Sequence, residues 1–146
     1  MEIAIGADHG GYKLKEALIV YLRKQGHSVF DEGAFSDKSC DYPEFARRVV
    51  KLVLARKAKM GILICKTGLG MSMAANRVKG IRAALCHNAR MVKSSRQHNN
   101  ANILVFGANY TKKTQAKGMC DVFLKEKFLG GRHARRIRKM EQINDK

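Results

Sequence analysis

The sequence predicts an α/β fold: a doubly wound, five-stranded parallel sheet with helices on both faces. Two features of the 146 residues indicate this fold. Short apolar runs rich in β-branched residues alternate with longer amphipathic stretches, which is the pattern of repeated strand–helix units. The alternation continues over about 110 residues with no linker and no internal repeat. We therefore expect a single domain spanning residues 1–146.

Five apolar runs are predicted as strands: residues 2–6, 28–31, 61–65, 81–86 and 103–107. The third run (GILIC) and the fifth (ILVFG) contain no charged residue. Strands of a parallel sheet that is covered on both faces have this continuous apolar character. These two are therefore expected to be the most buried strands.

The stretches between the strands are predicted as helices. Residues 12–25 place a row of leucines on one face and are followed by the stop signal Gly26. Pro43 is suited to a first helical turn, so a second helix is expected over residues 44–57. Further helices are predicted over residues 71–77, 89–96 and 112–128, with a basic one at about 131–144.

The composition is globular and strongly basic. Apolar residues make up 45% of the chain and charged residues 28%, which excludes disordered and collagen-like classes. The 29 Lys and Arg against 12 Asp and Glu give a formal net charge of +17. Nucleic acid, an anionic membrane surface or a phosphorylated small molecule would each match this charge, and so would a surface charged only for solubility.

The cysteines and the N-terminus indicate the compartment. Cys40, Cys65, Cys86 and Cys120 form no CxxC pair and have no histidine at zinc-finger spacing, so no metal site is expected. The N-terminus lacks the basic and apolar regions of a signal peptide, and no run of eighteen apolar residues occurs. We expect a cytoplasmic protein with reduced thiols and no membrane partner.

Two segments resemble nucleotide-binding motifs but do not match them. Gly6, Gly10 and Gly11 have the spacing GxxxGG rather than GxGxxG. Residues 61–67, GILICKT, end like a phosphate loop, but no glycine precedes Lys66 and the preceding residues are those of a buried strand. Neither an NAD site nor an ATP site is predicted.

Residues 65–72, CKTGLGMS, are the most informative segment. They follow the third strand, and ligands of such sheets bind at the carboxyl ends of the strands. Gly68 and Gly70 allow a tight turn into the next helix, where free N–H groups bind an anion. A helix N-terminus also lowers the pKa of a nearby thiol, so Cys65 is a candidate thiolate base or nucleophile. The alternative is a structural cysteine beside a tight turn.

Three further segments carry candidate chemistry. Asp8 and His9 end the first strand and form either an acid–base pair or a helix N-cap beside a surface histidine. His98 lies before the fifth strand as a second acid–base group or in an ordinary exposed loop. Arg132 and Arg136 share a helix face, where like charges cost about 0.2 to 0.5 kcal/mol, so a bound phosphate explains them better than stability does. An electrostatic contact with nucleic acid is the alternative there.

Several separated segments together carry a resemblance. They are IAIGADHGGYKLKE, DYPEFA, GILICKTGLGMSMAANRVKGIRAALC, SRQHNNANILVFGA and GGRHARRI, in this order over nearly the whole chain. This pattern resembles the ribose-5-phosphate isomerase B family, which includes galactose-6-phosphate isomerase subunits. The resemblance implies a Rossmann-like three-layer α/β/α sandwich that forms a homodimer, in some members a tetramer. It implies active sites between subunits and neither a metal nor an organic cofactor.

The implied reaction interconverts ribose 5-phosphate and ribulose 5-phosphate through a cis-enediolate. The alternatives are an isomerase of allose, galactose or tetrose phosphate and, from another class, a non-catalytic polyanion or RNA binder. The lack of aromatic residues in the basic C-terminal segment argues against specific nucleic-acid binding.

The resemblance also implies individual roles. Cys65 would move the proton between C2 and C1, Thr67 and His98 would assist ring opening, and Asp8 would handle hydroxyl protons. The backbone of residues 68–72 would hold the enediolate oxygen. The implied substrate-binding residues are His9, Tyr42, Gly68, Leu69, Gly70, Met71, Ser72, Asn99, Arg132 and Arg136. Of these, His9 and the two arginines would hold the phosphate, and the partner chain would contribute Asn99 together with His98.

The chain departs from the family pattern at two positions, and a third position decides between branches of the family. Lys66 stands where the family usually has glycine. If the backbone there is left-handed, the lysine is strained. If it is not, the ammonium is free to stabilise a thiolate or an enediolate. Asn109 replaces an arginine that reaches the phosphate in many relatives. Met71 excludes the branch of the family that uses glutamate as the base.

Overall fold

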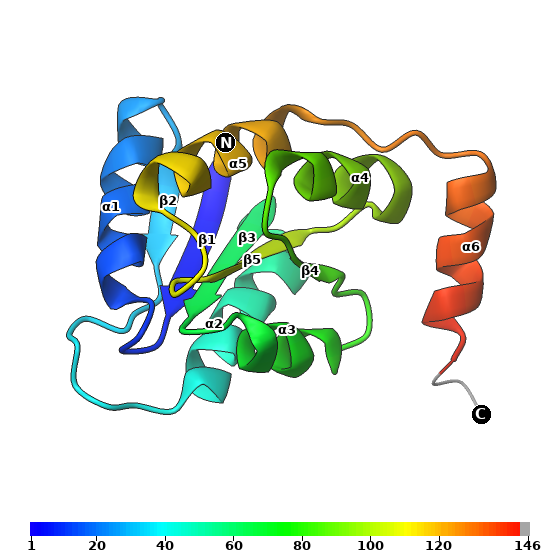
Figure 1. Ribbon diagram of the computed structural model, residues 1–146. Coiled ribbons are helices and arrows are strands. Elements are labelled where there is room, and N and C mark those ends of the chain that lie inside the picture. The colour runs from blue at the N-terminus through cyan, green and yellow to red at the C-terminus, as the bar shows by residue number, and fades with distance from the viewer. Residues whose placement is uncertain (144–146) are drawn as a thin grey trace.

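The computed structural model describes residues 1–143 and is a three-layer α/β/α sandwich (Figure 1). Its strands are β1 (Glu2–Ala7), β2 (Ser28–Asp31), β3 (Met60–Cys65), β4 (Ala83–Leu85) and β5 (Ile103–Gly107). They form one parallel sheet in the order β2-β1-β3-β5-β4. The predicted fold class is therefore confirmed.

Helices cover both faces of the sheet. They are α1 (Tyr12–Lys24), α2 (Tyr42–Leu54), α3 (Leu69–Asn76), α4 (Ala89–Asn99), α5 (Lys113–Lys125) and α6 (Arg132–Glu141). One apolar cluster lies between the sheet and α1, α4 and α5, and a second lies between the sheet and α2 and α3. Every residue of β3 and β5 is buried, as predicted from their uninterrupted apolar sequences.

Some element boundaries differ from the prediction for local reasons. Strand β4 begins two residues late, at Ala83, because the N–H groups of Arg82 and Ala83 donate to the side-chain oxygens of Asn102 and Asn76. Helix α2 ends early, at Leu54, close to Arg56 with its φ of +56°.

The end of α4 corrects one expectation about the site. The helix continues to Asn99 and stops at Asn100, which adopts a left-handed conformation with φ +48°. His98 and Asn99 therefore lie in the last helical turn and not in a loop. A helical turn fixes both side chains relative to the sheet more firmly than a loop would.

The topology forms a crevice between β1 and β3. From β1 the chain crosses to β2 on one side, and from β3 it proceeds toward β4 on the other, so the two turns that follow β1 and β3 open beside each other. The N–H of Asp8 donates to the carbonyl oxygen of Ile64 at 3.2 Å, which joins these turns. The predicted chemistry of residues 8–9 and 65–72 converges at this edge.

Helix α6 stands apart from the sheet and runs beside α4 (Figure 1). None of its residues is buried, although Glu141 forms a 2.8 Å ion pair with Arg82. The predicted helix extended to about residue 144, and residues 144–146 lie outside the described part of the chain. Across residues 1–143 no helix combines the length and the apolar character needed to cross a membrane.

Candidate active site

Cys65 is the last residue of β3, and a tight turn follows it. Its side chain is buried, and its Sγ accepts the N–H of Gly68 at 3.2 Å. Gly68 has φ +79°, and a Cβ there would lie 2.4 Å from Cδ1 of Leu85 and 3.0 Å from the backbone of Phe106. Only glycine fits this turn. An N–H donor strengthens its bond when the acceptor is charged, so this contact stabilises a thiolate at Cys65.

The first turn of α3 provides free N–H groups next to this sulfur. The N–H of Leu69 donates to Oγ1 of Thr67 at 3.2 Å, and that of Ser72 donates to the carbonyl of Gly68. No partner in the described chain accepts the N–H groups of Gly70 and Met71. Two unpaired donors at a helix N-terminus form a suitable binding site for a negatively charged oxygen.

Tyr42 covers these donors. It is the first residue of α2, and a Cβ built on Gly70 would lie 2.6 Å from its Cζ atom. The tyrosine ring therefore packs directly against the Gly70 backbone. On the other side of the turn, a hollow of about 480 Å³ is lined by Thr67, Leu69, Leu85, His87 and Tyr110.

Asp8 is buried at the end of β1 and holds the turn that follows it. Its Oδ1 accepts the N–H groups of Gly10 at 2.9 Å and Gly11 at 3.1 Å. Gly11, and not Asp8, is the N-cap residue of α1, so the alternative of a simple N-cap does not apply. Atom Oδ2 has no hydrogen-bond partner in the described chain and can exchange protons with a ligand.

His9 is held by a residue that the sequence did not indicate. The backbone N–H of Cys40 donates to Nδ1 of His9 at 3.3 Å, and the Cys40 Sγ lies 3.9 Å from the same nitrogen. An accepting Nδ1 places the proton of the neutral ring on Nε2. His9 thus offers an N–H donor to a ligand. No motif links two residues 31 positions apart, so sequence reasoning had no signal for this contact.

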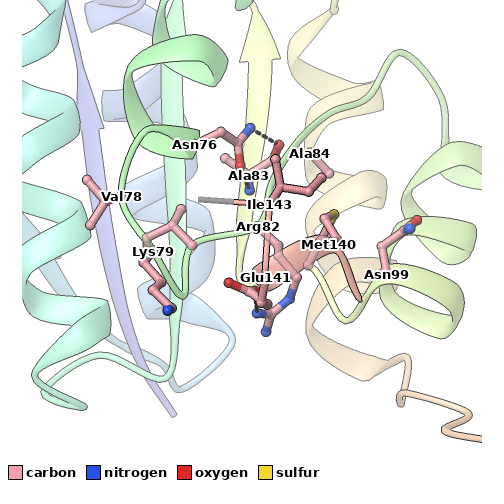
Figure 2. A pocket seen from close by; sticks show the side chains of 12 residues that line it. Asn76, Val78, Lys79, Arg82, Ala83, Ala84, Asn99, Met140, Glu141 and Ile143 are labelled. Atoms are coloured by element: carbon pink, nitrogen blue, oxygen red, sulfur yellow. Dashed lines mark hydrogen bonds and ion pairs between the residues drawn. The ribbon is translucent and has the colours of Figure 1, made fainter. Parts of the chain in front are cut away.

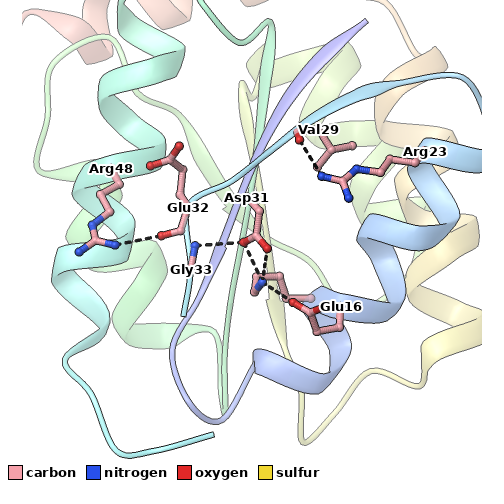
Figure 3. A network of polar contacts seen from close by, with 8 residues as sticks. Glu16, Arg23, Val29, Asp31, Glu32, Gly33 and Arg48 are labelled. Atoms are coloured by element: carbon pink, nitrogen blue, oxygen red, sulfur yellow. Dashed lines mark hydrogen bonds and ion pairs between the residues drawn. The ribbon is translucent and has the colours of Figure 1, made fainter. Parts of the chain in front are cut away.

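An ion-pair network around the buried Lys15 supports the segment that leads to Cys40 (Figure 3). The ammonium of Lys15, which is fully buried, lies 2.6 Å from Oε1 of Glu16 and 2.7 Å from Oδ1 of Asp31. Asp31 also accepts the N–H of Gly33, whose carbonyl accepts the N–H of Ala7 at 2.6 Å. The network therefore attaches the chain after β2 to the end of β1, next to Asp8.

The remaining predicted residues gather elsewhere. The ring of His98 stacks on that of His133, with centroids 4.4 Å apart and planes at 11°. A pocket of about 270 Å³ here is lined by His98, Asn99, His133, Arg136, Ile137 and Met140. The pKa of His133 is lowered by desolvation, and further by His98, Arg132 and Arg136. A bound anion would reduce this concentration of positive charge.

The two groups of residues lie at opposite edges of the sheet. The Cys65 group lies at the carboxyl ends of β1 and β3, whereas α4 runs back from the end of β4 toward the start of β5 (Figure 1). The end of α4 lies near the start of β4, since Nε of Arg82 donates to the carbonyl of Asn100 at 3.0 Å. One chain alone does not bring His98 to Cys65.

A further pocket, of about 470 Å³, lies between α3, β4 and α6 (Figure 2). Of the predicted residues only Asn99 contributes to it. Its walls combine apolar side chains with polar groups that are already paired, namely Arg82 with Glu141 and Asn76 with the backbone of Ala83. Within residues 1–143 no group of three or more His, Cys, Asp or Glu side chains is arranged to hold a metal ion.

Comparison with known proteins yields consistent matches. Residues 3–140 match the family model described as Ribose/Galactose Isomerase. The chain is 39% identical to ribose-5-phosphate isomerase B of Escherichia coli over 145 residues, which cover 99% of this chain and 97% of that one.

Two solved structures have the same fold over almost their full length. Ribose-5-phosphate isomerase B of Clostridium thermocellum matches with a TM-score of 0.98 and 46% identity, covering 99% of this chain and 98% of that chain. The Thermotoga maritima ribose 5-phosphate isomerase matches with a TM-score of 0.96 and 48% identity, covering 97% and 98% respectively.

The sheet and these matches define a sugar-phosphate isomerase, which is an enzyme. The chain belongs to the ribose/galactose isomerase family. The resemblance seen in the sequence motifs is thereby confirmed.

Proposed function

We propose that this protein interconverts ribose 5-phosphate and ribulose 5-phosphate through a cis-enediolate, with Cys65 as the base. One observation carries the proposal: Sγ of Cys65 accepts the Gly68 N–H at 3.2 Å beside the unpaired N–H groups of Gly70 and Met71. A base and a site for a developing negative oxygen are the two elements that proton abstraction next to a carbonyl requires. The relatives whose printed names specify ribose 5-phosphate support the choice of sugar.

Each proton in the reaction has a residue to carry it. The Cys65 thiolate takes the proton from C2 of the open-chain aldose, and the negative charge passes to the carbonyl oxygen on C1. The N–H groups of Gly70 and Met71 stabilise that oxygen, and one such donor is worth about 2.7 to 4 kcal/mol in enzymes where it has been removed. Asp8 transfers a proton from the oxygen on C2 to the oxygen on C1, and the Cys65 thiol returns its proton to C1.

Ring opening and substrate binding use the other predicted residues. Thr67 and His98 assist ring opening with a hydroxyl and an imidazole, two groups that can donate and accept hydrogen bonds at the ring oxygen. Tyr42 and Asn99 line the sugar, and Leu69 and Ser72 complete the turn around it. His9, Arg132 and Arg136 bind the phosphate, since guanidinium groups form paired, charge-assisted bonds with phosphate oxygens.

The proposed site requires two copies of the chain. His98, Asn99 and the α6 arginines lie at the opposite edge of the sheet from Cys65 in one chain, so a second copy must supply them. A two-fold pair completes two identical sites at once, because each chain gives what the other lacks. The proposal therefore includes a homodimer. It also includes a cytoplasmic setting, which suits the four free thiols.

The test is a coupled isomerase assay with ribose 5-phosphate, allose 6-phosphate, galactose 6-phosphate and erythrose 4-phosphate. We expect the highest kcat/KM with ribose 5-phosphate and a loss of at least about 10²-fold in Cys65→Ala. A preference for a hexose or tetrose phosphate would replace the proposed substrate. Absence of turnover with all four sugars would refute the isomerase function.

A further inference from the structure

Lys66 is the residue next to Cys65, and the proposed reaction gives it no role. Its side chain is exposed. Its backbone is unstrained, because in the described chain the non-glycine residues with positive φ are Arg56 and Asn100. Lysine therefore fits this position, and its ammonium is available for a function.

The Lys66 side chain crosses the turn that carries Asp8 and His9. A Cβ built on Gly10 would lie 2.3 Å from Cγ of Lys66, 3.3 Å from its Cδ and 3.3 Å from Oδ1 of Asp8. The aliphatic stem thus lies directly on Gly10, on the residue that follows His9. The backbone carbonyl of Lys66 also accepts the N–H of Asn109 at 2.9 Å. Lys66 therefore occupies the point where the turns after β1, β3 and β5 meet.

Lys66 adds a permanent positive charge to this edge of the sheet. The three turns comprise residues 8–11, 66–68 and 108–112, and they contain two lysines, Lys66 and Lys112, of which Lys66 is the one whose stem lies on the turn that carries Asp8 and His9. No acidic side chain within residues 1–143 forms an ion pair with its ammonium. A dianionic substrate that approaches this half of the site also meets the carboxylate of Asp8, whose negative charge a nearby cation offsets.

We infer that Lys66 binds the phosphate group of the substrate from the same chain that supplies Cys65, which places cations from both copies around the phosphate. The inference rests on the proposed function for the class of substrate. A lysine ammonium on a flexible stem forms charge-assisted hydrogen bonds with phosphate oxygens. Its stem lies on Gly10, the residue after His9, so the flexible ammonium can reach a phosphate that His9 of the proposal also binds.

The geometry favours the phosphate over the Cys65 sulfur as the partner of Lys66. The Cys65 side chain belongs to the apolar cluster on the α2 and α3 face. The Lys66 stem lies on Gly10, which leads into α1 on the opposite face. Lys66 is the first residue after β3, and its stem follows the turn of residues 8–11 while the Cys65 side chain stays in the apolar cluster.

The experiment compares three variants with the wild type. Lys66→Met keeps the stem without its charge, and Lys66→Arg restores a cation. Lys57→Met removes another exposed lysine, before β3 and at the other edge of the sheet. The readouts are binding of inorganic phosphate by calorimetry, its competitive inhibition constant and the KM for ribose 5-phosphate. We expect phosphate affinity to fall about tenfold in Lys66→Met, to recover in Lys66→Arg and to stay at the wild-type value in Lys57→Met.

Other results would overturn the inference. Equal phosphate affinity in the wild type and Lys66→Met would remove Lys66 from the phosphate site. A changed pH dependence of Cys65 alkylation with unchanged phosphate affinity would assign the ammonium to the sulfur. Calorimetry separates this inference from the proposed function: a wild type that turns over no sugar phosphate but binds phosphate through Lys66 refutes the function and leaves the phosphate site intact.

Discussion

The backbone N–H of Gly68 donates to Sγ of Cys65 over 3.2 Å. Within residues 1–143, Cys65 is the buried thiol whose sulfur accepts a backbone N–H, whereas Cys86 has the Ser95 side chain as its partner. Burial raises the pKa of Cys86 to about 11, and burial raises that of Cys120 further, with the charge of Asp121 adding to it. Those two sulfurs stay protonated near neutral pH. The Cys65 sulfur instead accepts the N–H of Gly68, which forms a stronger bond to a negatively charged acceptor. It lies at the carboxyl ends of the strands, where ligands of such sheets bind.

Cys65→Ser tests this difference. A serine hydroxyl is a far weaker acid than a thiol, so we expect kcat to fall by about 10² to 10⁴-fold. The thermal unfolding midpoint should change little, since serine is similar in size and keeps an acceptor for the Gly68 N–H. Cys86→Ala is the matched control and should retain activity, because Cys86 lies outside the proposed site. Wild-type turnover by Cys65→Ser would exclude Cys65 as the base.

The close approach of Tyr42 to Gly70 provides a second prediction. In Gly70→Ala the added Cβ would lie 2.6 Å from the ring, so the ring and the first turn of α3 must move apart. We expect kcat to fall by about tenfold to a hundredfold, since displaced N–H donors no longer meet the enediolate oxygen. The measurement is steady-state kinetics with ribose 5-phosphate.

Gly118→Ala is the control for that glycine. Gly118 lies within α5, and a Cβ there meets no atom within 4 Å. Alanine in a helix interior is more stable than glycine by about 0.5 to 1 kcal/mol, so this variant should gain stability and keep its activity. Equal kcat values for Gly70→Ala and the wild type would show that the donors at α3 do not contribute to the reaction.

The sequence predicted the carboxyl edge of the sheet well because local patterns specify it. The apolar run of β3 followed by Gly68 and Gly70 predicts a strand and a tight turn without further information. It could not predict that Cys40 holds His9, because this contact depends on the path of the loop before α2. The helical position of His98 was also missed, since the stop depends on the left-handed conformation of Asn100 rather than on a glycine or a proline.

Lys15 is another feature that the sequence did not reveal. In the sequence, Lys15 cannot be distinguished from an exposed lysine on the surface of a helix. In the structure, its ammonium is fully buried between Glu16 and Asp31. Removal of one member of a buried ion pair leaves the other without its counter-charge. The Asp31 side chain keeps 23% of its exposure, which reduces this cost. We expect Lys15→Met to lower the free energy of unfolding by about 2 to 3 kcal/mol.

Urea denaturation measures this loss, and Lys24→Met serves as the control. Lys24 is an exposed residue of the same helix, and surface changes of this kind are usually within about 0.5 kcal/mol. If Lys15→Met loses activity only in proportion to its fraction of unfolded protein, the substitution acts through the stability of the whole fold and not through the site. Unfolding curves that coincide for Lys15→Met and Lys24→Met would show that the buried network does not stabilise the fold.

The division of the site between two copies predicts complementation. Cys65→Ser and His98→Ala should each be nearly inactive alone. In a dimer that contains one chain of each kind, one site carries both changes and the other carries neither. Random exchange makes half of the dimers mixed, each with one of two sites intact, so mixing should recover about a quarter of the wild-type activity. No recovery after verified subunit exchange would place Cys65 and His98 in sites that do not share chains.

The stacked rings of His98 and His133 predict how the α4–α6 contact depends on pH. Desolvation, His98 and the arginines Arg132 and Arg136 lower the pKa of His133, so the folded protein favours the neutral ring. Such a group stabilises the folded state above the pKa of an unfolded histidine, about 6.5, and this contribution is lost as pH falls through the lower folded pKa. We expect α6 to loosen from α4 in that acidic range.

An NMR titration of the His133 ring, together with hydrogen exchange of α6, measures this effect. Arg136→Gln removes one nearby cation and should raise the pKa of His133 toward its ordinary value. Inorganic phosphate should raise it also, because an anion held beside Arg132 and Arg136 favours the protonated ring. A His133 midpoint that responds neither to the arginine change nor to phosphate would mean that no anion binds at this face of α6, and the assignment of the two arginines to the substrate phosphate would then be wrong.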